Sequence, residues 1–252
     1  MSRTMSYYDL RDAMREPGCP VCRLRHDSVE GYIESLLWES VTDPDRRRAL
    51  RRSHGFCYRH AWALVRVSAS LGVAIIGRDV LETLRHELER GAFQAVPTLS
   101  FRRVQEALDS DEPTEATAEL VANLEPEAPC PACEWADKME GLQLKALVGA
   151  LGDDEEFRAL YTSSDGLCLP HFRKALERVR SRESFDALVD AQQVIWNRLI
   201  EQLDESIRKN DHRYAKEAWG EETGSWIRLI ATLVGSRPEE KREERDTRWS
   251  FS

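Results

Sequence analysis

The chain has 252 residues, of which 41% are hydrophobic and 32% are charged, and its formal net charge is −9. This acidic balance argues against a protein that coats nucleic acid or anionic membranes through charge alone. The first residues lack the apolar stretch of a signal peptide, and no apolar run approaches the ~20 residues needed to cross a bilayer, so we expect a cytoplasmic protein without a membrane span.

The first motif along the chain is Cys-Pro-Val-Cys at residues 19–22. Proline after a cysteine fixes its own φ and favours a tight turn, or knuckle, in which two sulfurs can converge. A helix is predicted next, because the apolar residues at 29, 32, 33, 36 and 37 share one helical face. Asp43 before Pro44 predicts the start of a short helix that ends at Gly55.

A second motif, Gly-Phe-Cys-Tyr-Arg-His, occupies residues 55–60. Gly55 can adopt the positive φ that ends one helix, and Cys57 and His60 then lie at i and i+3 on one face of the next helix. A longer helical stretch is expected over residues 58–91, with interruptions near Gly72 and Gly77.

Residues 109–129 contain seven acidic and no basic residues, and we interpret them as an acidic linker with a short helix in its middle. Cys-Pro-Ala-Cys follows at 130–133, then a helix, a short helix capped by Asp153 or Asp154, and Gly-Leu-Cys-Leu-Pro-His at 166–171. Helix is expected over 169–209. The predicted apolar faces of the two long helices are Leu144, Leu147, Val148 and Leu151 for the first, and Phe185, Leu188, Val189, Gln192, Trp196, Leu199 and Leu203 for the second.

One more helix is predicted near the C-terminus, with Thr223 or Ser225 as its cap. Its apolar residues are Trp226, Ile227, Ile230, Leu233 and Val234. The charged stretch 236–252 is predicted to be a disordered tail.

The two pairs of motifs form an internal repeat, because every cysteine and histidine of the first pair recurs in the second at one constant offset along the chain. Each copy reads C-P-x-C, then an intervening stretch of the same length, then C-x-x-H, and together the copies use all six cysteines. Three thiols and one imidazole are the donor set of a closed structural zinc site. We therefore predict two zinc ions per chain, the first bound by Cys19, Cys22, Cys57 and His60, and the second by Cys130, Cys133, Cys168 and His171.

These motifs predict an all-α fold of two zinc-pinned helical repeats with a C-terminal helical extension. The expected domains are residues 1–108 and 130–235, joined by the linker 109–129 and followed by the tail. Iron or an iron–sulfur centre is the alternative to zinc. A c-type haem is not indicated, because no histidine follows either Cys-x-x-Cys pair directly.

The paired CPxC and GxCxxH boxes, together with Glu221, Glu222, Ser225 and Trp226 as a Glu-Glu-x-x-Ser-Trp motif, resemble an uncharacterised prokaryotic family of unknown function. The resemblance covers most of the chain. It implies that the eight cysteines and histidines are metal ligands and implies no activity.

Four functional hypotheses follow from the sequence. The favoured one is a zinc-stabilised interaction protein whose partner is another protein, with a homodimer as one form of that partner. A redox or metal sensor that uses the same thiolates is the second. Nucleic-acid binding through the basic cluster Arg46–Arg52 is the third and is disfavoured by the acidic charge. An enzyme is disfavoured too, because no phosphate loop, nucleophile elbow or HExxH motif is present; Glu221, Glu222, Trp219 and Trp226 could line a pocket but are expected to be structural.

Overall fold

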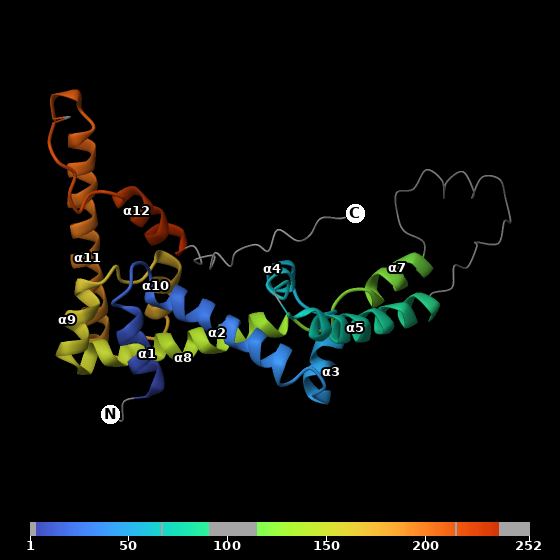
Figure 1. Ribbon diagram of the computed structural model, residues 1–252. Helices are drawn as coiled ribbons and strands as arrows, with labels where there is room; N and C mark the ends of the chain where they lie inside the picture. Colours follow the sequence, from blue (N-terminus) through green and yellow to red (C-terminus); the bar gives the residue numbers. More distant parts are fainter. Residues whose placement is uncertain (1–3, 67, 91–114, 215, 237–252) are drawn as a thin grey trace, which may run out of the picture. The chain divides into compact units, whose positions relative to one another are not determined.

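The computed structural model describes residues 4–66, 68–90, 115–214 and 216–236 of the chain. Every regular element in these residues is a helix, which confirms the predicted all-α class (Figure 1). No described helix is long and apolar enough to cross a membrane. The helices are α1 Met5–Ala13, α2 Pro20–Trp38, α3 Pro44–Arg52, α4 Tyr58–Trp62, α5 Ser70–Arg90, α7 Glu115–Asn123, α8 Pro131–Asp153, α9 Glu155–Ser163, α10 Leu169–Leu176, α11 Arg182–Lys209, the 3₁₀ helix η1 His212–Tyr214, and α12 Ser225–Val234.

The helices pack into two compact units. Unit 1 comprises residues 1–28 and 136–252, and unit 2 comprises residues 29–135. This division differs from the predicted domains 1–108 and 130–235, because its boundaries fall inside the long helices α2 and α8. Each unit therefore contains residues from both predicted repeats. Of the predicted linker, the described part includes α7, which supplies the expected short helix, whereas the tail beyond residue 236 lies outside the described residues.

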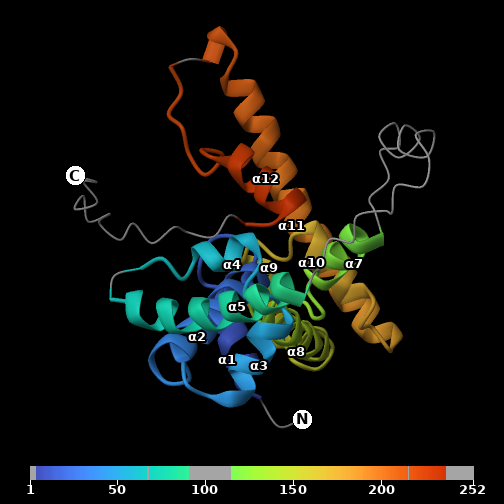
Figure 2. The same cartoon turned by 90° about the vertical axis from the view of Figure 1, so that its right-hand side faces the viewer.

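The core of unit 1 is built around the second half of α8. The predicted face of this helix is buried, with Leu144, Leu147 and Leu151 fully inaccessible to solvent. Asp154 begins α9 as predicted, since its carboxylate accepts a hydrogen bond from the Phe157 backbone N–H at 3.0 Å. α9 packs against α11, and α12 packs against both α10 and α11 (Figures 1 and 2).

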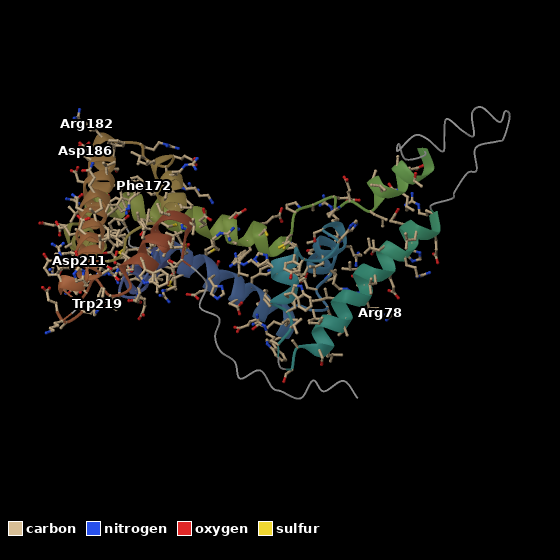
Figure 3. The ribbon with its side chains drawn as sticks, turned by 90° about the horizontal axis from the view of Figure 1, so that it is seen from above. Arg78, Phe172, Arg182, Asp186, Asp211 and Trp219 are labelled. Atoms are coloured by element: carbon tan, nitrogen blue, oxygen red, sulfur yellow. The ribbon has the colours of Figure 1, made fainter. Side chains whose placement is uncertain are left out.

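Two helix boundaries in unit 1 differ from the predictions. The stretch 169–209 is two helices, because the chain turns after α10 and Ser181 caps α11 by accepting the Ser184 backbone N–H at 3.1 Å. Figure 3 shows Arg182 and Asp186, which form an ion pair, at the start of α11. The cap of α12 is Gly224, with a φ of 77°, and not Thr223 or Ser225.

The core of unit 2 contains the predicted apolar face of α2, on which Ile33 and Leu36 are 0% and 2% exposed. Asp43 caps α3 as predicted and accepts the backbone N–H groups of Asp45 and Arg46, both at 2.9 Å. The stretch 58–91 is broken between α4 and α5, upstream of the two glycines expected to interrupt it. Gly72 instead permits close packing, because a Cβ there would lie only 3.1 Å from the Leu37 side chain.

An ion-pair cluster joins α3 to α5. Asp79 on α5 accepts hydrogen bonds from Arg47 at 3.1 Å and Arg51 at 2.7 Å, and its side chain is 15% exposed. Burial opposes ionisation of this carboxyl, but the hydrogen bonds from Arg47 and Arg51 lower the pKa of Asp79 overall. Its contribution to stability is therefore complete above the ordinary pKa of an aspartate and is lost as the pH falls through the lowered value.

We expect Asp79→Asn to destabilise unit 2 by about 1–3 kcal/mol, because two charge-assisted hydrogen bonds lose their acceptor charge. Asp45→Asn is the matched control, since Asp45 pairs with Arg48 on the same helix but its side chain is 85% exposed. The control should cost less than about 1 kcal/mol. Chemical denaturation at neutral pH measures both, and equal losses in the two variants would contradict the expectation.

Candidate metal centres

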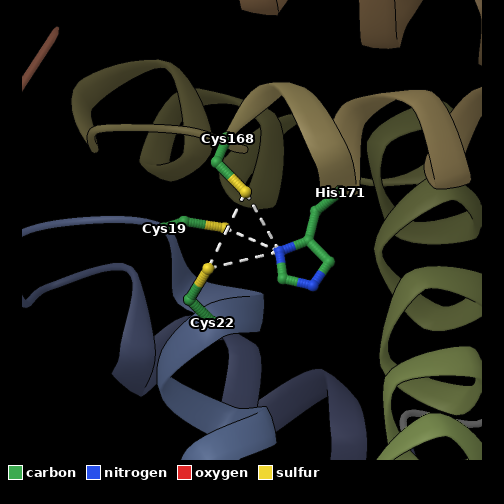
Figure 4. A group of neighbouring side chains, drawn as sticks. All are labelled: Cys19, Cys22, Cys168 and His171. Atoms are coloured by element: carbon green, nitrogen blue, oxygen red, sulfur yellow. Dashed lines mark hydrogen bonds between the residues drawn. The ribbon is translucent and has the colours of Figure 1, made fainter. Parts of the chain in front are cut away.

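Cluster 1 lies in unit 1 and consists of Cys19, Cys22, Cys168 and His171 (Figure 4). The His171 Nδ1 atom is 3.4 Å from the sulfurs of Cys19 and Cys22 and 3.2 Å from that of Cys168. The Cys22 and Cys168 sulfurs are 3.7 Å apart. All four side chains therefore converge on one point, three of them from buried positions.

Cluster 2 lies in unit 2 and consists of Cys57, His60, Cys130 and Cys133. The His60 Nδ1 atom is 3.4 Å from the sulfurs of Cys57 and Cys133 and 3.5 Å from that of Cys130. The Cys57 and Cys133 sulfurs are 3.7 Å apart, as in the corresponding pair of cluster 1. The two clusters thus have nearly the same internal geometry.

The structure brings together all eight predicted ligand residues, but it does not pair the motifs as predicted. We expected Cys19 and Cys22 to share a site with Cys57 and His60, whereas the structure places them with Cys168 and His171. The reason lies in the two long helices, since α2 begins in unit 1 and continues into unit 2, while α8 begins in unit 2 and continues into unit 1. Each Cys-Pro-x-Cys motif therefore meets the Cys-x-x-His motif of the other half of the chain.

Helix starts position every ligand. Cys57 and Cys168 are the N-cap residues of α4 and α10, as the Cys-x-x-His spacing predicted, and neither sulfur is used as a cap. The other two motifs differ slightly from expectation, because Pro20 and Pro131 are the first residues of α2 and α8. Each Cys-Pro-x-Cys motif is therefore a helix start and not a separate knuckle.

The glycines before the Cys-x-x-His motifs both have a positive φ, which is 90° at Gly55, as predicted, and 64° at Gly166. Their surroundings differ. A Cβ at Gly55 would meet nothing within 4 Å, whereas a Cβ at Gly166 would lie 2.6 Å from the Ile195 side chain and 3.2 Å from Gln192. Gln192 is fully buried and donates to the Leu167 carbonyl, so it has little room to move.

We expect Gly55→Ala to cost about 1–2 kcal/mol, which is the penalty for a side chain in the left-handed region. Gly166→Ala should cost about 2–4 kcal/mol, because steric overlap with Ile195 and Gln192 adds to the same penalty. Thermal unfolding of the two variants under identical conditions compares them. A larger loss in Gly55→Ala would show that the crowding at Gly166 is unimportant.

The distances between the sulfur and nitrogen atoms of each cluster fit a tetrahedrally coordinated metal ion. Zinc binds cysteine sulfur at about 2.3 Å and histidine nitrogen at about 2.0–2.1 Å, which gives tetrahedral edges of about 3.8 Å between sulfurs and about 3.5 Å between sulfur and nitrogen. The observed separations are 3.7 Å and 3.2–3.5 Å. A disulfide would bring two sulfurs to about 2.05 Å, and all six thiols are free. Each cluster can hold a metal ion.

The electrostatics of the clusters also favour a bound cation. Burial raises the pKa of the Cys19 thiol well above its ordinary value. In cluster 2, burial and the repulsion of Cys130 raise the pKa of Cys133 to about 12. Burial lowers the pKa of His171, but hydrogen bonds with Cys168, Cys22 and Glu140 raise it to about 11 overall. Metal binding requires three thiolates and a neutral imidazole, and the positive charge of the ion stabilises that combination in a buried site.

The sequence did not reveal Glu140, an acidic residue on α8 that lies behind His171. Its Oε2 atom is 3.6 Å from His171 Nε2, the nitrogen that faces away from the sulfurs, and its side chain is only 3% exposed. Arg25 donates to the same carboxylate at 2.9 Å, and Lys174 at 2.5 Å. Burial opposes its ionisation, but hydrogen bonds from His171 and Lys174 lower the pKa of Glu140 to about 2. No metal-ligand spacing points to this residue, so only the fold identifies it.

Of the other candidate residues, Glu222 has structural partners, whereas the two tryptophans are exposed and not part of a core. Glu222 is buried, accepts the Gly220 backbone N–H at 2.7 Å and pairs with Lys209 at 2.7 Å. Trp219 and Trp226 are 51% and 64% exposed, and Figure 3 shows Trp219 beyond the end of α11. These residues line none of the hollows beside the clusters.

The basic cluster on α3 is occupied by contacts within unit 2. Arg47 and Arg51 bind Asp79, Arg48 binds Asp45, Arg52 binds Glu127, and Arg46 lies over the ring of Tyr32. This arrangement is a network of internal charge pairs and gives no support to nucleic-acid binding.

Comparison with known proteins places this chain in a family. Residues 1–240 match the sequence profile described as "Family of unknown function (DUF6062)". The chain belongs to this family. It is also similar to the "Uncharacterized 23.9 kDa protein in xynA 3'region" of Caldicellulosiruptor sp. (strain Rt8B.4), with 21% identity over 224 residues that cover 88% of this chain and 98% of that protein. No solved structure matches this DUF6062 chain. The resemblance to an uncharacterised family is thus confirmed.

Proposed function

We propose that this chain is a zinc-binding structural and interaction protein in which each cluster holds one zinc ion. The observation that carries the proposal is the convergence of three sulfurs and one imidazole nitrogen in each cluster at tetrahedral spacing. Four protein donors leave no open position for water or substrate, so the ions would stabilise the fold and would not perform hydrolysis. The partner proposed with this role is another protein, and a second copy of the chain is one such partner.

The chemistry of the cysteines also supports a reducing, cytoplasmic location. All six thiols are free and all belong to the clusters, as is typical of metal-binding proteins in a reducing compartment. An oxidising compartment would favour disulfides between sulfurs held this close.

Metal analysis tests the proposal directly. The protein, purified without added metal, should contain two zinc ions per chain by elemental analysis and should show no visible absorption. Iron together with visible charge-transfer bands would replace the structural assignment with an iron or iron–sulfur centre. Absence of any bound metal would refute the proposal.

A further inference from the structure

We propose that the two clusters have different tasks: cluster 1 retains its ion, whereas cluster 2 is the site that exchanges its ion and reacts with oxidants. This inference rests on the proposed function, because it requires an ion in both clusters. Two differences carry it: a chain segment covers cluster 1, and the ligands of cluster 2 are more exposed. The inner geometry does not carry it, since that is nearly the same in both clusters.

The end of α12 covers cluster 1. A Cβ built on Gly235 would lie 3.4 Å from the Cys22 sulfur and 3.9 Å from the Cys168 sulfur, so the backbone at this residue lies directly against the cluster. The next residue, Ser236, accepts a hydrogen bond from the Cys19 backbone N–H at 2.9 Å. Cys22 is the one partly exposed ligand of cluster 1, and Gly235 shields its sulfur. An incoming chelator or oxidant must therefore displace this segment.

The histidine side of cluster 1 is also closed. Glu140 faces the outer nitrogen of His171 and is held in place by Arg25 and Lys174. A carboxylate in this position fixes the ring orientation and makes the inner nitrogen a stronger donor.

Cluster 2 is more open. Two of its ligands, Cys57 and Cys133, are partly exposed, and their sulfurs are the pair 3.7 Å apart. A surface hollow of about 520 Å³ lies beside the cluster and is lined by Cys57, Cys130 and neighbouring residues of the segments 53–56 and 126–129. The hollow beside cluster 1 is about 230 Å³, and the two ligands that line it, Cys19 and Cys168, are only 5% and 1% exposed.

The reaction at cluster 2 with a peroxide would proceed in two steps. One of the two partly exposed thiolates, Cys57 or Cys133, attacks a peroxide oxygen, which forms a sulfenate and releases one water after protonation. The other thiolate attacks the sulfenate sulfur, so that a Cys57–Cys133 disulfide forms and a second water leaves after protonation. Two thiolates are oxidised and one peroxide is reduced. The ion loses two of its four donors and dissociates.

The test follows zinc release from the full-length protein with a chromophoric chelator, first alone and then with hydrogen peroxide. We expect one zinc ion per chain to be released at least tenfold faster than the other. Peptide mapping after one equivalent of peroxide should find the Cys57–Cys133 disulfide, with Cys19, Cys22 and Cys168 still reduced. Two ions released at the same rate, or faster release from cluster 1, would overturn the inference.

Matched double variants show which cluster releases its ion in the fast kinetic phase and which in the slow one. Cys57→Ser with Cys133→Ser should abolish the fast phase and keep the slow one, and Cys22→Ser with Cys168→Ser should do the reverse. Because these variants could unfold, peptide mapping of the unaltered protein provides an independent answer. If the starting protein contains no zinc, the proposed function itself fails, and that result differs from two ions leaving at equal rates.

Discussion

Replacing Cys22 and Cys168 together by serine should leave one bound zinc ion per chain, whereas replacing Cys22 and Cys57 together should leave none. The first pair belongs to one cluster and spares the other, while the second pair removes one donor from each cluster. A cluster with a missing thiolate keeps too few donors to close its coordination shell. Elemental analysis after desalting into metal-free buffer measures the difference.

The same two variants discriminate between the pairing in the structure and the pairing within each predicted repeat. Pairing within the repeat requires the opposite result, with one ion retained when Cys22 and Cys57 are replaced and none when Cys22 and Cys168 are replaced. Cys19→Ser with His171→Ala provides an independent check of cluster 1, since it too should spare cluster 2. If only cluster 2 bound metal, the unaltered protein would contain one ion and not two, and only the Cys22 and Cys57 variant would lose it.

Removing the metal from both clusters should unfold much of the protein. Structural zinc contributes roughly 10–16 kcal/mol in zinc-finger peptides, which rivals the roughly 5–15 kcal/mol total stability of a typical domain. Cys19 and Cys168 are themselves part of the apolar core of unit 1, so loss of the ion leaves mutually repelling thiolates or unpaired thiols among buried Leu and Phe side chains. Far-ultraviolet circular dichroism during titration with a strong chelator should show a cooperative loss of helix.

Acid should act in the same direction as the chelator, because protons compete with the ion for the thiolates and the imidazole. Stability should therefore be high near neutral pH and fall as acid displaces the metal. His171→Ala should lower the melting temperature strongly. The matched control is His86→Ala on α5, because His86 is exposed and pairs only with Glu89 among the contacts described; it should change stability by less than about 0.5 kcal/mol. An unchanged helix signal in metal-free protein would contradict a structural role.

Local spacing explains why much of the site could be predicted. The Cys-x-x-His motif places both side chains in one helical turn whatever the rest of the fold does, and Asp43 and Asp154 cap their helices through bonds to residues two or three positions away. The buried faces of α2 and α8 follow from the 3.6-residue period in the same way. The position of the break in 58–91 and the existence of the break in 169–209 were not predicted. In both stretches the apolar period continues across a turn whose position depends on packing between helices.

The sequence by itself determined the set of eight residues that form the two clusters, the helical class and the starts of α3, α4, α9 and α10, because each depends on residues that are close together along the chain. The tertiary structure alone decided which halves combine into a cluster, since the constant offset between the two copies of the motifs fits both pairings equally well. It also decided which groups surround each cluster. Glu140 and Gly235 reach cluster 1 from distant helices, and such long-range contacts depend on the course of α8 and α12 through space, which no local spacing records.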